Sequence, residues 1–292
     1  MQNVLILGGT RFFGKKLTAN LLRSGADVTI LTRGNASDSF GPDVKRLIAD
    51  RTDAAALRQA VGSGDYDVVY DNICYTPQDA EAAVRLFDGR AGRYIVTSSK
   101  SVYPFGGPRK KESDFDPYRY PLPSEYPDKP DYAEGKRLVE TVLFRQATFP
   151  AAAVRFPIVL GSDDYTRRLH FHIEHIKQGL PLGIPNPDAL LTFIDSDEAA
   201  SFLGWLGTSA LEGPVNACSK GETTPGKIVS LIEEALNTKA HVADKTDDDH
   251  MSPFGVPESW YMDTSKAESA GYTFRQLDDW LPDLIRKLAG ES

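Results

Sequence analysis

The 292-residue chain has few cysteines, no excess of basic residues and no long apolar run. Its two cysteines, Cys74 and Cys218, lie far apart, which is typical of packed thiols in a reducing compartment and not of a disulfide framework. The formal net charge of −8 argues against a surface that binds phosphates, so we do not expect nucleic acid as the principal partner. The first apolar run, residues 4–7, is too short for a signal peptide or a membrane span. We therefore expect a cytoplasmic protein with no membrane partner.

The sequence does contain short β-branched runs that alternate with segments of helical periodicity. Six runs are expected to be strands, at residues 3–7, 27–31, 45–48, 67–70, 94–97 and 152–156. Between the first two, Phe13, Leu17 and Leu21 recur at helical spacing, and Ser24-Gly25 marks the end of that helix. Thr52 or Asp53 is placed to cap the next helix. The alternation predicts an α/β fold with a doubly wound parallel sheet of the Rossmann type.

The second half of the chain predicts a different organisation. Residues 104–130 are rich in proline, glycine and charge, which indicates a long surface loop that covers a functional site. Beyond Gly161 we expect helices at 165–178, 225–237 and 277–288. The segments between them are too scattered to predict a further sheet. We therefore expect a smaller, mostly helical lobe that binds the substrate over the carboxyl ends of the strands.

These expectations divide the chain into two units. The Rossmann domain is predicted to span residues 1–160, with residues 188–216 returning to it. The substrate-binding lobe is predicted to comprise residues 161–187 and 217–292.

A glycine-rich turn follows the first expected strand and opens the first helix. It consists of Gly8, Gly9, Thr10, Arg11, Phe12, Phe13 and Gly14. Glycines let the backbone approach a pyrophosphate closely, and the N-terminus of the helix stabilises its charge. A turn of this kind inside a strand, helix, strand unit predicts dinucleotide binding.

The end of the second expected strand bears on which dinucleotide binds. Thr32 stands where an NAD enzyme carries an acid for the ribose 2′-hydroxyl. Arg33 and Arg11 could contact a 2′-phosphate instead, because a guanidinium group suits phosphate geometry. Two solvated surface arginines are the alternative interpretation. We expect NADP as the cofactor, with NAD less favoured.

Tyr132 and Lys136 form a second motif, because four residues on a helix place both side chains on one face. A phenol ordinarily has a pKa of about 10, and a neighbouring ammonium favours its ionised form. Such a pair suits proton transfer at neutral pH. Upstream, the segment Ser98-Ser99-Lys100-Ser101-Val102-Tyr103 follows the fifth expected strand.

Together, the turn and these two motifs resemble the extended short-chain dehydrogenase/reductase superfamily. The turn is similar to its G-x-x-G-x-x-G pattern, with Arg11 in place of the middle glycine, and the serine segment is similar to its S-S-x-x-V-Y pattern. The variant G-G-T-R-F-x-G is most similar to a divergent branch that includes chloroplast stem-loop RNA-binding proteins and bacterial epimerase/dehydratase-like proteins.

The resemblance implies roles for individual residues. Ser99, Tyr132 and Lys136 align with the catalytic serine, tyrosine and lysine, and Lys136 would also reach the nicotinamide ribose. Asp50 matches an acid that contacts the adenine, and the alternative is that it only caps the next helix. No metal is expected: among His170, His172 and His175, only the last two share a helical face, which leaves a zinc ion short of ligands.

The resemblance implies an NAD(P)-dependent oxidoreductase or epimerase that transfers hydride at a secondary alcohol or ketone of a small molecule. In the segment after the fifth strand, dehydratases of the 4,6 type resemble the pattern S-T-D-E-V-Y. This chain has Lys100 and Ser101 at the positions of the two acids in that pattern. Nucleotide-sugar 4-epimerase is an alternative, although Ile158 and Leu191 replace an asparagine and an arginine that contact the diphosphate in such enzymes. From another class, the alternative is a cofactor-binding regulatory or RNA-associated protein without turnover. The sequence leaves open whether two copies of the chain form a homodimer.

Overall fold

The computed structural model of the protein describes residues 2–35, 37–127 and 130–291. Seven parallel strands form the main sheet, in the order β10-β6-β5-β4-β1-β2-β3. They are β1 (Asn3–Leu7), β2 (Asp27–Thr32), β3 (Val44–Ile48), β4 (Val68–Asp71), β5 (Tyr94–Ser99), β6 (Ala151–Phe156) and β10 (Gly213–Asn216). The strand order reverses direction between β1 and β4. In open parallel sheets the ligand crevice lies at such a reversal, outside the carboxyl ends of the strands. The predicted doubly wound α/β fold is confirmed.

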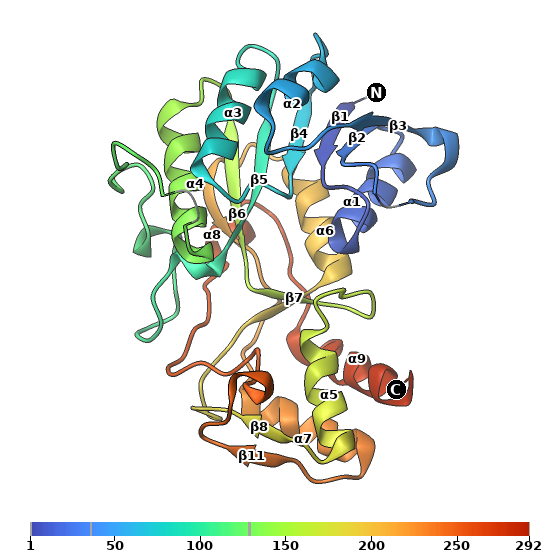
Figure 1. Ribbon diagram of the computed structural model, residues 1–292, viewed down its shortest axis with the longest axis vertical. Coiled ribbons are helices and arrows are strands. Elements are labelled where there is room, and N and C mark those ends of the chain that lie inside the picture. The colour runs from blue at the N-terminus through green and yellow to red at the C-terminus, as the bar shows by residue number, and fades with distance from the viewer. Residues whose placement is uncertain (1, 36, 128–129, 292) are drawn as a thin grey trace.

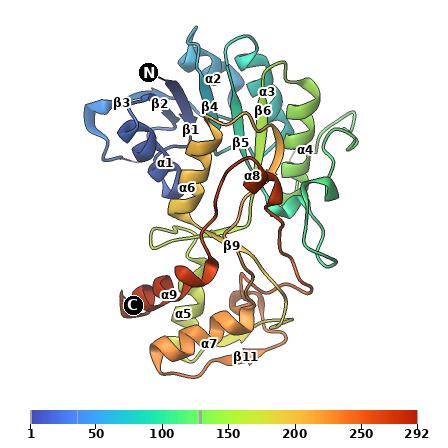
Figure 2. The same cartoon turned by 180° about the vertical axis from the view of Figure 1, so that it is seen from behind.

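Helices cover both faces of this sheet (Figures 1 and 2). One face carries α1 (Phe12–Arg23) and α6 (Ser196–Leu206), and the other carries α2 (Ala54–Val61), α3 (Pro77–Phe87) and α4 (Tyr132–Gln146). Alternate side chains of a strand point to opposite faces, so Val4 and Ile6 enter the first core while Leu5 and Leu7 enter the second. Burial on both faces explains why β1 is an uninterrupted apolar run.

The capping prediction for α2 is met by Asp53, whose carboxylate accepts hydrogen bonds from the backbone amides of Ala55 and Ala56. The remaining short helical segments are η1 (Gly41–Asp43), η2 (Lys100–Val102), η3 (Glu112–Asp114), η4 (Asp248–His250), η5 (Leu277–Asp279) and α8 (Ser265–Ser269).

A smaller lobe lies below the carboxyl ends of the strands in Figure 1. It contains α5 (Arg168–Gln178), α7 (Pro225–Leu236) and α9 (Leu281–Glu291), packed on an apolar core that includes Ile173 and Ile228. The helix expected from residue 165 begins only at Arg168, because the Asp164 carboxylate holds the preceding turn through the amides of Thr166 and Arg168.

Two further differences from the expected lobe have local causes. Residues 277–291 form η5 and then α9, not one helix, because Pro282 has no amide to continue a helix but fits the first turn of a new one. The expectation that the lobe segments form no sheet was wrong. Within the expected lobe, β8 (Pro181–Gly183) pairs with β11 (His241–Ala243). Outside it, β7 (Ile158–Leu160) pairs with β9 (Phe193–Asp195). Strands of three residues are too short to show a period in the sequence.

The long loop at 104–130 divides its contacts between the two parts of the molecule. In its first part, the amides of Gly106 and Lys110 donate to the carbonyl oxygens of Ser259 and Tyr261, and the Asp263 amide donates to the Lys110 carbonyl oxygen. Its later part lies against α3 and α4, where the Tyr126 hydroxyl donates to Glu81 at 2.9 Å. Residues 128 and 129 of the predicted loop lie outside the described residues.

A buried ionic network ties this loop to the sheet. Arg155 on β6 is fully buried, and its guanidinium donates to the Glu140 carboxylate on α4 at 2.6 Å. It also donates to the Tyr103 hydroxyl at 2.7 Å and to the carbonyl oxygens of Glu112 and Phe115. Burial opposes the charge of Arg155, but the Glu140 carboxylate outweighs this and raises the pKa of Arg155. One arginine thus joins β6, α4 and the loop.

Candidate active site

The glycine-rich turn lies at the carboxyl end of β1, where the crevice opens. Gly8 has a φ of +85°, and a Cβ atom at Gly14 would lie 2.5 Å from the carbonyl oxygen of Gly8. α1 begins within this segment, at Phe12, with neither a side-chain cap nor an acidic residue in its first turn. The N-terminal end of its dipole is therefore left for an anion.

The departure at the middle glycine position has a structural explanation. Arg11 has extended backbone angles that any residue adopts, so this position does not require glycine. The left-handed conformation falls instead on Phe12, which has a φ of +49°. The Phe12 ring packs edge-on against Tyr165 at 6.2 Å, and the Arg11 guanidinium lies 6.0 Å from the same Tyr165 ring. Arg11 therefore points toward the lobe.

Asn72, which the sequence analysis did not identify, faces this turn from the end of β4. Its side-chain oxygen accepts a hydrogen bond from the Thr97 hydroxyl at 2.8 Å. Its amide nitrogen is buried, has no hydrogen-bond partner among the described residues, and would lie 3.3 Å from a Cβ atom at Gly14. An unpaired buried donor is costly, so a ligand acceptor beside the turn would satisfy it. The turn and Asn72 together fit a dinucleotide phosphate.

The residues predicted to meet the adenosine half lie at the ends of β2 and β3. The Thr32 hydroxyl accepts from the Gly34 amide at 3.2 Å, and Arg33 beside it is exposed. The Asp50 carboxylate accepts from both the backbone amide and the hydroxyl of Thr52, and these bonds, together with the charge of Arg33, lower the pKa of Asp50. Arg33 and Asp50 thus lie together, whereas Arg11 lies against Tyr165.

The predicted catalytic residues come from β5 and α4, next to the same crevice. Tyr132 is the first residue of α4, which Asp131 caps, and it is 55% exposed. Lys136 follows one turn later and is 1% exposed. Its ammonium donates to the carbonyl oxygens of Thr97 at 2.7 Å and Cys74 at 2.8 Å, and lies 5.8 Å from the centre of the Tyr132 ring.

Ser99 completes the group as the last residue of β5, two residues beyond the carbonyl that Lys136 binds. Its hydroxyl oxygen accepts from the Ser101 amide at 3.1 Å and lies 3.0 Å from the Ser101 hydroxyl. Lys136 therefore fixes the start of α4 against the end of β5. This brings all three predicted residues to one side of the crevice.

Tyr75 is a further aromatic residue at this site that the sequence motifs did not indicate. The Lys136 ammonium lies 4.6 Å from the centre of its ring, and the ring is 6.5 Å from that of Tyr132. The backbone approaches α4 closely here, since a Cβ atom at Gly135 would lie 2.6 Å from the Tyr75 carbonyl oxygen. Tyr75 is 47% exposed, and the partial burial of its ring, with Tyr165 and Tyr132 nearby, raises the pKa of Tyr75 to about 12. The only sequence signal was its position shortly after β4.

Other candidates from the sequence lie elsewhere. His172 hydrogen-bonds Ser252 at 2.6 Å, and His175 lies 3.1 Å from His250. Burial lowers the pKa of His172 to about 4. Across residues 2–35, 37–127 and 130–291, no three side chains of the kinds that ligate metals come together as a metal site. Ile158 and Leu191 both pack on the apolar core of the lobe and offer no polar side-chain atom.

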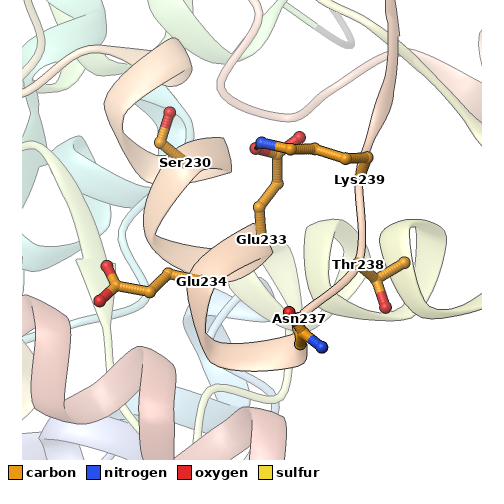
Figure 3. A pocket seen from close by; sticks show the side chains of 6 residues that line it. All are labelled: Ser230, Glu233, Glu234, Asn237, Thr238 and Lys239. Atoms are coloured by element: carbon orange, nitrogen blue, oxygen red, sulfur yellow. Dashed lines mark hydrogen bonds and ion pairs between the residues drawn. The ribbon is translucent and has the colours of Figure 1, made fainter.

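A surface hollow at the end of α7 lies in the lobe, away from the sheet (Figure 3). Its lining consists of Ser230, Glu233, Glu234, Asn237, Thr238 and Lys239. Glu233 is already paired with Lys239 at 2.6 Å, and this pairing lowers the pKa of Glu233. The hollow therefore contributes nothing to the site at the crevice. In the part of the chain that the structure describes, no helix is both long and apolar enough to cross a membrane.

Comparisons with known proteins identify relatives of this chain. A curated relative, "Chloroplast stem-loop binding protein of 41 kDa b, chloroplastic" from Arabidopsis thaliana, is 26% identical over 221 residues. The match covers 70% of this chain and 55% of that protein, so the chain spans about half the length of this relative.

Solved structures show the same fold over nearly the whole chain. dTDP-glucose 4,6-dehydratase from Bacillus anthracis, solved with NAD, has a TM-score of 0.77 at 13% identity and covers 100% of this chain and 97% of its own. UDP-glucose 4-epimerase from Thermus thermophilus, also solved with NAD, has a TM-score of 0.74 at 16% identity and covers 99% of this chain and 100% of its own.

The sequence profile described as "NAD dependent epimerase/dehydratase family" matches residues 4–217, well over half of the chain. The resemblance to extended short-chain dehydrogenases/reductases is thereby confirmed, and the chain belongs to the NAD dependent epimerase/dehydratase family.

Proposed function

We propose that the protein is an NAD(P)-dependent oxidoreductase or epimerase that acts at a secondary alcohol or ketone of a small molecule. The observation that carries this proposal is Lys136, whose ammonium joins the end of β5 to the start of α4 and faces the Tyr132 ring. It places a fixed positive charge beside a half-exposed phenol, next to the turn that fits a dinucleotide phosphate. Ser99 supplies a hydroxyl at the same edge of the sheet.

The residues that would hold the cofactor are the turn at 8–14, the N-terminus of α1, Asn72 and Lys136. When bound, the nicotinamide ring donates or accepts the hydride. The Tyr132 hydroxyl gives a proton to the substrate oxygen or takes one from it. The Lys136 ammonium stabilises the phenolate form, and the Ser99 hydroxyl orients the reacting oxygen by a hydrogen bond.

The substrate that fits best is a hydroxy or keto compound smaller than a nucleotide sugar. The apolar side chains of Ile158 and Leu191 cannot supply the hydrogen bond and the charged contact that a diphosphate would need. Each of these two contacts is worth about 1–3 kcal/mol of binding free energy. Calorimetry with UDP, dTDP and their common sugars tests this. Micromolar binding of any of them would favour a nucleotide-sugar 4-epimerase instead.

RNA association is the second candidate, favoured by the match to the chloroplast stem-loop binding protein. The net charge of −8 argues against it, because phosphate neutralisation needs a basic surface. A screen of hydroxy and keto compounds with NAD(H) and NADP(H), followed at 340 nm, is paired with a gel-shift assay on structured RNA at several salt concentrations. Turnover without a shift supports the enzyme. A salt-sensitive shift without turnover would support the RNA candidate.

NADPH is expected to bind about tenfold more tightly than NADH, a difference of about 1.4 kcal/mol. Arg33 is exposed beside Thr32, and among the described residues no carboxylate is ion-paired with it, although the Asp50 carboxylate lies near enough to interact with its charge. Its guanidinium is therefore placed to contact a 2′-phosphate. Fluorescence titration measures both affinities. Arg33→Ala should abolish the preference, while Arg286→Ala on α9 should leave it unchanged. A tenfold preference for NADH would show that the arginine argument is wrong.

Gly14→Ala is expected to weaken dinucleotide binding by about tenfold or more. The new Cβ atom would collide with the Gly8 carbonyl oxygen at 2.5 Å, which forces the turn and the start of α1 apart. The same titration reports the loss. Gly290→Ala is the control, because its Cβ atom meets nothing within 4 Å. Unchanged affinity in the Gly14 variant would exclude the turn as the phosphate site.

A further inference from the structure

Lys100 is a buried charge that the proposed hydride transfer does not use. It directly follows Ser99 and begins η2, the turn that Ser99 caps. The residue is 2% exposed. Its position along the chain therefore holds it next to the predicted catalytic serine.

The residues around Lys100 offer few hydrogen-bond acceptors to its ammonium group. Its Nζ atom donates to the Trp260 carbonyl oxygen at 3.3 Å and lies 4.4 Å from the centre of the Trp260 indole ring. Among the described residues, no carboxylate is ion-paired with it. The Cys218 thiol is an ionisable neighbour that acts on its charge, and burial raises the pKa of Cys218 to about 12. Lys100 thus has one distant neutral acceptor for three N–H donors.

Other buried cations in the chain have counter-charges or closer hydrogen-bond acceptors. Arg155 is paired with Glu140 at 2.6 Å, and Arg51 is paired with Asp71 at 2.5 Å. Lys136 has two carbonyl acceptors at 2.7 and 2.8 Å. A buried charge without a counter-charge is unfavourable, and burial lowers the pKa of Lys100 to about 7.

A second unpaired donor lies in the same place. The indole nitrogen of Trp260 is buried and has no hydrogen-bond partner among the described residues. Trp260 belongs to a lobe segment that pairs with Leu190 and Leu191, and its ring packs on Phe105 at 4.6 Å. Both donors therefore belong to one contact, between the residue that follows Ser99 and the lobe segment that contains Trp260.

A cavity adjoins Cys218, the thiol neighbour of Lys100. Cys218 lines a cavity of about 280 Å³, together with Arg109, Thr192 and Met262. The two basic side chains at the cavity are paired already, Arg109 with Glu222 and Lys220 with Glu268. Lys100 does not line this cavity but lies behind its lining residue Cys218, and among the described residues no carboxylate is ion-paired with it.

We infer that Lys100, with Trp260, recognises a carboxylate group that the substrate carries close to the carbon that exchanges hydride. This inference rests on the proposed function and narrows its substrate class to hydroxy and keto acids. A carboxylate is favoured over a phosphate because one ammonium neutralises one negative charge, and a phosphate dianion would stay partly uncompensated in a buried site.

The test compares glycolate with glycolamide, its uncharged analogue, on protein saturated with NADPH, using ligand-observed NMR titration. The wild type is expected to bind glycolate about tenfold more tightly, the equivalent of about 1.4 kcal/mol. Lys100→Met, which keeps the length and burial of the side chain, should bring the ratio close to one. Lys220→Met, at the same cavity, should keep the ratio. Thermal melting checks that each variant is folded.

The pH dependence gives a second readout. Above pH 7 the affinity for glycolate should fall about tenfold per pH unit, because the neutral amine of Lys100 must first gain a proton while the Cys218 thiol stays neutral. Glycolamide should show no such dependence.

Equal binding of the two probes in the wild type, or a preference that survives in Lys100→Met, would overturn the inference. Inorganic phosphate that binds more tightly than glycolate, and only through Lys100, would overturn the assignment to a carboxylate. The binding titration needs no turnover, so a failure of this inference can be distinguished from a failure of the proposed function. Carboxylate binding through Lys100 without oxidation of any hydroxy acid would contradict the proposed function alone.

Discussion

Tyr132→Phe is expected to lower kcat about 1,000-fold while dinucleotide affinity stays within about twofold. The substitution removes the transferable proton but keeps the ring beside Lys136. Tyr132 is half-exposed, and among the described residues its hydroxyl makes no hydrogen bond that the substitution would remove. Steady-state kinetics with a substrate from the 340 nm screen, together with NADPH titration, measures both quantities.

Tyr75→Phe is the matched control, because Tyr75 packs against the same ammonium at 4.6 Å. Its phenol keeps its proton up to a pH of about 12, so it is poorly suited to proton exchange at neutral pH. We expect this variant to keep most of its activity. The reverse pattern, with Tyr75→Phe inactive and Tyr132→Phe active, would assign the proton transfer to Tyr75.

Glu140→Gln is expected to lower the free energy of unfolding by about 3–5 kcal/mol. The Arg155 guanidinium would remain fully buried without its counter-charge, although its bonds to Tyr103 and to two carbonyl oxygens would persist. Urea denaturation followed by circular dichroism measures the loss.

Asp283→Asn serves as the control for this loss, because its ion pair with Arg286 is exposed on α9. An exposed pair contributes about 0–1 kcal/mol, so this variant should unfold close to the wild type. A loss of under about 1 kcal/mol in Glu140→Gln would mean that the network of Arg155 is stabilised mainly by its neutral partners.

The main sheet and its helices could be predicted from the sequence because each carries its own local signal. The runs that form β1 and β5 are apolar and β-branched, and the helix after Asp53 has an acceptor for its first amides. The paired strands β8 and β11 could not be predicted. They have three residues each, and their partners lie about sixty residues apart, so only tertiary packing selects them.

The candidate site was predictable to the extent that spacing encodes it. The interval between Tyr132 and Lys136 and the glycines of the turn are visible in the chain, and their proposed roles stay predictions. Asn72 and Tyr75 were missed because their significance comes from topology. They follow β4, the neighbour of both β1 and β5, and contacts with Thr97 and Lys136 place them at the crevice.

The path of the C-terminal segment limits which parts of the chain can be exchanged as a unit. After the lobe, the chain returns to the sheet at α8, where the Lys266 ammonium donates to the carbonyl oxygens of Glu212 and Pro214. Phe274 then stacks on Phe202 of α6 within the core on one face of the sheet. The region that matches the family profile ends at residue 217, before these contacts. A recombination that exchanged everything beyond that point would also remove part of the core of the dinucleotide-binding half. An exchange of C-terminal halves at this point would therefore need compensating substitutions in that core.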